Sequence, residues 1–186
     1  ILLRRELPRK VRLLRTVSSA LVVWSDAALE RGIGRIGWVA YDPADNTILT
    51  SHWDVPTWLI LSFVHPNHCI GQLEILAALM VYLTLPAVRT AERRIFHYVD
   101  NTSAVMSLFK GYSKQSDSSR LVHIFAILQA HLRFDVWWEY VPSKANIGDM
   151  PSRLDWSLLR DLSARWIPTV VLTADQYFAP LASWLT

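Results

Sequence analysis

The chain has 186 residues, 52% of them hydrophobic and 19% charged, with a formal net charge of +3. The abundance of apolar and aromatic residues excludes an intrinsically disordered chain. The single cysteine excludes an internal disulfide and a cysteine-based zinc site, while the mild positive charge permits a nucleic-acid partner without requiring one.

The N-terminal residues are basic, with arginines and a lysine against one acid, Glu6. We expect residues 1–19 to be a connector from a preceding domain, because the chain begins at Ile1 rather than Met. A solvated arm without a role is the alternative. We expect no membrane contact, since the apolar run at 75–85 is shorter than the roughly 20 residues that cross a bilayer.

The first half of the chain predicts three strands joined by short turns, which form an antiparallel meander, at 20–25, 35–41 and 47–53. The first strand is expected to end at Asp26, with Gly32 and Gly34 breaking the chain after it. The segment 57–64 fits either a short helix or a loop.

The second half predicts helices that alternate with strands. The expected helices are 72–85, 102–110, about 117–133 and one from Asp149 to Trp166, and the expected strands are 95–99 and 136–141. Helices between the later strands imply parallel crossovers, so the expected fold is α/β with a five-stranded mixed sheet. We expect the domain to span 20–166, with 167–186 as a C-terminal extension packed on it.

Four acids stand at comparable places in this pattern, at strand ends or on the helices that follow strands: Asp26, Glu74, Asp100 and Asp149. Asp100 is the first candidate for chemistry, because ligands of open α/β sheets lie at the carboxyl ends of strands. Taken alone, Asp100 is explained more readily as a helix N-cap.

Glu74 is the most informative acid, because it stands alone on an otherwise apolar helix. A buried ionised carboxylate costs several kcal/mol unless it is paired or binds a metal. A distant arginine is one possible partner. Several converging carboxylates instead suit Mg²⁺ or Mn²⁺, and two such ions clamp the oxygens of a phosphoryl displacement.

The sequence also resembles a known family, in an ordered set of motifs across residues 22–154. The motifs are Trp-Ser-Asp-Ala at 24–27, Gly-Trp-Val at 37–39, Gln-Leu-Glu at 72–74, Val-Asp-Asn-Thr-Ser-Ala at 99–104 and Asn-Ile-Gly-Asp-Met-Pro-Ser-Arg at 146–153. They resemble the ribonuclease H domain of retroelement reverse transcriptases, of the long-terminal-repeat or tyrosine-recombinase type.

The resemblance implies a ribonuclease H-like fold with helices on both faces of the sheet. It implies hydrolysis of the RNA strand of RNA–DNA hybrids with two Mg²⁺ ions, for which Mn²⁺ can substitute. It also implies a polymerase domain N-terminal in the same intracellular polyprotein. By resemblance, Asp26 bridges both ions, Glu74 and Asp100 complete one site, and Asp149 completes the other.

Three further residues are candidates for substrate contact: Asn101, Ser152 and Arg153. Asn101 is equally expected as a helix-start residue, and Arg153 as part of a surface ion pair. The sequence departs from the family pattern in two ways. Gly148 stands where the family usually has alanine, and the cations where some members grip hybrid are few: Lys110, Lys114 and Arg120.

Two other functions remain as alternatives. One is a catalytically silent module of the same fold that binds or positions nucleic acid beside a polymerase. The other is a transposase or proofreading exonuclease of related fold, which ranks lower because Ala28 stands where the exonuclease needs a second acid.

Overall fold

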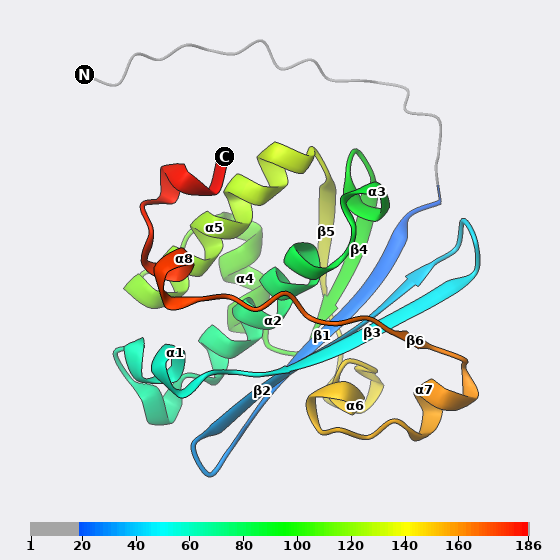
Figure 1. Cartoon of the computed structure of the whole chain (residues 1–186), viewed down its shortest axis with the longest axis horizontal. Helices are drawn as coiled ribbons and strands as arrows, with labels where there is room; N and C mark the ends of the chain where they lie inside the picture. Colours follow the sequence, from blue (N-terminus) through cyan, green and yellow to red (C-terminus); the bar gives the residue numbers. More distant parts are fainter. Residues whose placement is uncertain (1–18, 186) are drawn as a thin grey trace.

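The structure is a computed structural model that describes residues 19–185, so all but the last residue of the expected basic connector lies outside the described part. A six-stranded mixed sheet in the order β5-β4-β1-β2-β3-β6 forms the centre (Figure 1). The strands are β1 (Leu21–Glu30), β2 (Ile33–Asp42), β3 (Thr47–Asp54), β4 (Arg94–Val99), β5 (Asp135–Tyr140) and β6 (Arg165–Trp166). The predicted α/β class and mixed sheet are confirmed, with one strand more than expected.

The helices are α1 (Thr57–Ser62), α2 (Ile70–Thr84), α3 (Ala87–Thr90), α4 (Thr102–Lys110), α5 (Ser116–Leu132), α6 (Asp149–Ser152), α7 (Ser157–Asp161) and α8 (Ala174–Phe178). Short 3-10 turns are η1 (Pro66–His68), η2 (Ser143–Ala145) and η3 (Leu181–Leu185). Within residues 19–185, none of these helices combines the length and the apolar character that a membrane crossing needs.

The expectation that the first strand ends at Asp26 is wrong. Strand β1 continues to Glu30, because it pairs with β2 around a two-residue turn at Arg31 and Gly32, whose φ angles are 52° and 78°. Two positive φ angles match the right-handed twist of a tight hairpin. Gly34 lies inside β2 instead of breaking the chain. The parallel pairing of β1 with β4 does stop at Ser25, so Asp26 still lies where that pair ends.

The single helix expected from Asp149 to Trp166 is also wrong. Helix α6 ends after one turn, where Leu154 has a φ of 59° and the Asp155 N–H donates to the Met150 carbonyl over 2.8 Å. A hydrogen bond across the helix end, combined with a residue of positive φ, is typical of a helix C-cap. The chain then forms α7 and β6, and β6 extends the sheet beside β3.

Helices lie on both faces of the sheet. A Cβ atom on Gly34 would meet side chains of α1 and α2, whereas one on Gly37 would meet α6. Because residues three apart in a strand point to opposite faces, α6 lies on the face opposite α1 and α2. Helix α2 is buried almost completely and packs against β1 and α5.

The C-terminal residues contact the body of the domain. The Ser51 hydroxyl donates to the Ile167 carbonyl over 2.7 Å. The Arg120 guanidinium donates to the carbonyls of Tyr177 and Ala179, and lies 5.2 Å from the centre of the Tyr177 ring. Arg120 is therefore engaged in this contact within the domain, so one of the few cations considered for hybrid binding already has partners.

Candidate metal centre

Three of the four predicted acids converge at the carboxyl end of β4. Carboxylate oxygens of Asp26, Glu74 and Asp100 all lie within 4.8 Å of one another. Asp26 is the first residue of β1 beyond its parallel pairing with β4, and Asp100 directly follows β4. Glu74 reaches this point from the first half of α2, which packs on β1.

The explanation of Asp100 as a helix N-cap is wrong. Asn101 caps α4, since its side-chain oxygen accepts a hydrogen bond from the Ala104 N–H over 3.0 Å. This cap leaves the Asp100 carboxylate free to face the other two acids. It also shows the helix-start role that was one of the two explanations for Asn101.

Burial shapes the electrostatics of this cluster. It raises the pKa of Asp26 to about 7, against a lowering hydrogen bond from Ser152, and the nearby charges of Asp100 and Asp149 raise it further. Burial, followed by the charges of Asp26 and Asp100, raises the pKa of Glu74 well above its usual value. The cluster is thus unfavourable when fully ionised without a counter-charge.

A divalent cation fits this cluster. One Glu74 side-chain oxygen, Oε2, is buried without a hydrogen-bond partner. Within residues 19–185 no lysine or arginine forms an ion pair with Glu74, so the alternative of a distant arginine finds no support there. A donor set of carboxylate oxygens alone suits hard ions such as Mg²⁺ or Mn²⁺.

The loop before α6 is fastened directly to the strand that carries Asp26. The Asn146 side chain donates to the Ser25 carbonyl over 3.0 Å and accepts from the Gly148 N–H over 3.1 Å. A Cβ atom on Gly148 would lie 2.9 Å from the Ser25 carbonyl carbon. The glycine that departs from the family pattern is therefore required by this close approach.

Asp149 is the one predicted ligand outside the cluster. Its carboxylate, 35% exposed, accepts from Arg153 Nε over 2.6 Å. Arg153 also pairs with Glu30, over 3.1 Å. The surface ion pair that was the alternative explanation for Arg153 is thus present in this structure.

Ser152 is fully buried beside Asp26. Its hydroxyl oxygen lies 2.5 Å from Asp26 Oδ2 and 2.9 Å from the Asp149 carbonyl. A hydroxyl has one proton to donate, so Ser152 donates either to the ionised Asp26 or to the Asp149 carbonyl while accepting from a neutral Asp26. A side chain without exposed surface has no room for substrate, which argues for a positioning role.

Sequence reasoning missed two residues that build this site, Gly37 and Asn146. Both fall inside the motifs quoted above, but their roles depend on contacts between distant parts of the chain. Gly37 lies opposite Asp26 in the β1–β2 pair, and its missing side chain leaves room for Pro151 and Ser152. Asn146 bonds to Ser25, far away in sequence.

We expect the contribution of Asp26 to the stability of the metal-free protein to fall as the pH rises from about 4 to about 7, whereas buried His97, whose pKa burial lowers to about 3, contributes in the opposite direction. The raised pKa means that folded Asp26 keeps a proton that the unfolded chain releases in this window, so folding is favoured at the acidic end. The melting temperature of the unaltered protein in EDTA should therefore fall, relative to that of Asp26→Asn, between pH 5.5 and pH 8. Added Mg²⁺ should raise the melting temperature more at pH 8.

The variant Asp26→Asn is the reference for this experiment, because position 26 cannot titrate in it while His97 still does. An equal change of melting temperature in the two proteins between pH 5.5 and pH 8 in EDTA would contradict the expectation.

No protein-family model and no curated protein matches the chain. Solved structures of similar fold include the N-terminal RNase H domain of Rv2228c from Mycobacterium tuberculosis, solved as a fusion with maltose binding protein. The two share 15% identity over 79% of this chain and 100% of that one, with a TM-score of 0.50. RNase H1 from Halobacterium salinarum NRC-1 shares 16% identity over 77% and 99%, with a TM-score of 0.51. At these identities the likeness confirms the expected ribonuclease H-like fold.

Proposed function

We propose that this domain is a divalent-metal-dependent ribonuclease H, which hydrolyses the RNA strand of RNA–DNA hybrids. The observation that carries the proposal is the cluster of Asp26, Glu74 and Asp100, with an unpartnered buried oxygen on Glu74. It stands at the end of β4, in a fold shared with domains described as RNase H. Its acids are those that the motif likeness had singled out.

In this proposal Asp26, Glu74 and Asp100 would hold one Mg²⁺ ion, and Asp149 would serve with Asp26 as a ligand of a second once its carboxylate is released from Arg153. Bound ions of this kind activate a water and stabilise the leaving oxygen of a phosphodiester. Ser152 holds the Asp26 carboxylate in one orientation through its hydroxyl, and Asn101 fixes the start of α4 behind Asp100. Arg153, exposed on the same side, is a candidate for contact with substrate phosphate.

The wider setting rests on the motif likeness alone. We propose that the domain belongs to a retroelement reverse transcriptase inside the cell, with a polymerase domain N-terminal in the same polyprotein. An element of this kind needs its RNA template removed after DNA synthesis, which the proposed activity accomplishes.

The test is cleavage of a hybrid with labelled RNA, in Mg²⁺ and in EDTA, with labelled single-stranded RNA and duplex DNA alongside. We expect cleavage of the hybrid RNA alone, and only with Mg²⁺. A folded protein that leaves the hybrid intact in Mg²⁺ and in Mn²⁺, even when joined to its polymerase domain, would overturn the proposal.

A catalytically silent module of the same fold is the second candidate. The ion pair of Asp149 with Arg153 favours it, because this pair keeps one acid away from the cluster. The same assay separates the two functions, since a silent module binds hybrid without cutting it.

A further inference from the structure

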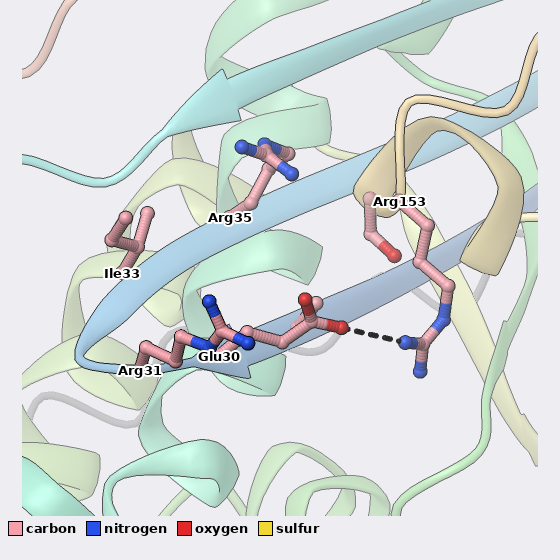
Figure 2. A pocket seen from close by; sticks show the side chains of 7 residues that line it. Glu30, Arg31, Ile33, Arg35 and Arg153 are labelled. Carbon is pink, nitrogen blue, oxygen red and sulfur yellow. Dashed lines mark hydrogen bonds and ion pairs between the residues drawn. The ribbon is translucent and has the colours of Figure 1, made fainter.

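A pocket of about 300 Å³ is lined by residues of the β1–β2 hairpin and by Arg153 (Figure 2). It lies beside the acidic cluster, because Ser152, another of its lining residues, contacts Asp26. Ala28 of β1 also lines the pocket. Its charged lining residues are Glu30 and three arginines, Arg31, Arg35 and Arg153.

The β1–β2 hairpin aligns this pocket with the cluster. Asp26, Ala28 and Glu30 alternate along β1 and therefore share one face, together with Arg35, which pairs with Ala28. At about 3.3 Å per residue, the pocket lies roughly 7–13 Å along the strand from Asp26. A nucleic-acid strand whose scissile phosphate is at the cluster has another phosphate within that reach.

The charges of the pocket favour an anion. Arg35 pairs with Asp54 over 2.6 Å, and Arg153 pairs with Asp149 and Glu30. Arg31 is exposed at the hairpin turn, and within residues 19–185 it forms no ion pair. Carboxylates therefore compensate Arg35 and Arg153, and within residues 19–185 Arg31 is the arginine of this pocket whose charge attracts an incoming anion.

Glu30 does not block an incoming anion. Its side chain is 71% exposed, and the Arg153 group that it contacts is 53% exposed. Exposed ion pairs of this kind are weak and exchange readily. An anion can therefore replace the Glu30 carboxylate on Arg153 while Glu30 turns to solvent.

We propose that this pocket binds one backbone phosphate of the strand that passes through the metal centre, with Arg31 and Arg153 as its contacts. The inference rests on the proposed function for the path of the strand. Guanidinium groups suit phosphate because their planar donors form two parallel hydrogen bonds to its oxygens. The pocket then fixes the strand a few nucleotides from the cleavage position.

The test compares hybrid binding by Arg31→Ala and Arg133→Ala in the Asp100→Asn protein, in EDTA, over a range of salt concentrations. Arg133 is a matched control, because it is also an exposed arginine with a positive φ, of 56°, but it precedes β5 at the opposite end of the sheet. The slope of log affinity against log salt is negative, and each lost phosphate contact reduces its magnitude by about one. We expect this loss for Arg31→Ala alone, with several-fold weaker binding and an unchanged melting temperature.

Hybrids with one neutral methylphosphonate linkage then locate the phosphate. At one linkage near the cleavage position, the losses of hybrid affinity caused by Arg31→Ala and by the neutral linkage should not be additive. Additive effects at every linkage, or equal slopes for the two arginine variants, would overturn the inference. Arg31-dependent binding of inorganic phosphate that leaves hybrid affinity unchanged would also overturn it, in favour of a free-phosphate site.

The outcomes separate this inference from the proposed function. An Arg31-dependent slope in a protein that never cuts hybrid supports the pocket and contradicts the nuclease. Cleavage by the unaltered protein without any effect of Arg31→Ala on binding supports the nuclease and contradicts the pocket.

Discussion

Replacing Asp100 with asparagine is expected to lower the rate of hybrid cleavage by about a thousandfold or more, which corresponds to about 4 kcal/mol of lost transition-state stabilisation. Asparagine keeps the shape of the side chain but removes one of three charges that converge within 4.8 Å. Because Asn101 and not Asp100 caps α4, the substitution should leave the helix start intact. Stability without metal should be unchanged or higher, since the variant relieves repulsion with Asp26 and Glu74.

The measurement is single-turnover cleavage of labelled hybrid in Mg²⁺, paired with thermal melting in EDTA. Asp161→Asn removes an exposed acid at the end of α7 and should cut like the unaltered protein. Cleavage by Asp100→Asn within tenfold of the unaltered rate would show that the cluster is not the reaction centre.

The order of elements and the acids at their ends could be predicted because these signals are local. The run of apolar residues before Asp100 marks a strand, and the small polar residues after it mark a helix start. The lone acid on α2 is visible because its neighbours along the chain are apolar. These local patterns led to the α/β class and to the three acids that converge.

The region after Asp149 could not be predicted from the same signals. Leu154, Leu158 and Leu162 follow helical spacing, but each is more than 40% exposed, so their spacing reflects no buried face. The positive φ of Leu154 ends α6 instead. The ion pair of Asp149 with Arg153, four residues later, is a contact in this region that the motif does not indicate.

Close backbone approaches are also invisible in the sequence, and Gly37 shows why they matter. Gly37→Ala is expected to destabilise the fold by about 3 kcal/mol or more and to lower cleavage further than unfolding alone explains. A Cβ atom there would lie 2.2 Å from the Ser152 nitrogen and 2.7 Å from the Pro151 carbonyl carbon. Both are backbone atoms, so α6 itself must move, carrying Ser152 away from Asp26 and displacing Asp149.

Gly71→Ala is the matched control, because a Cβ atom at that position on α2 meets nothing within 4 Å. In a helix this change should be neutral or stabilise by up to about 1 kcal/mol. Urea unfolding measures both variants, and cleavage is compared at a temperature where each is fully folded. If folded Gly37→Ala cuts at the unaltered rate, α6 does not position the metal ligands, and Asp26, Glu74 and Asp100 must act without Ser152 and Asp149.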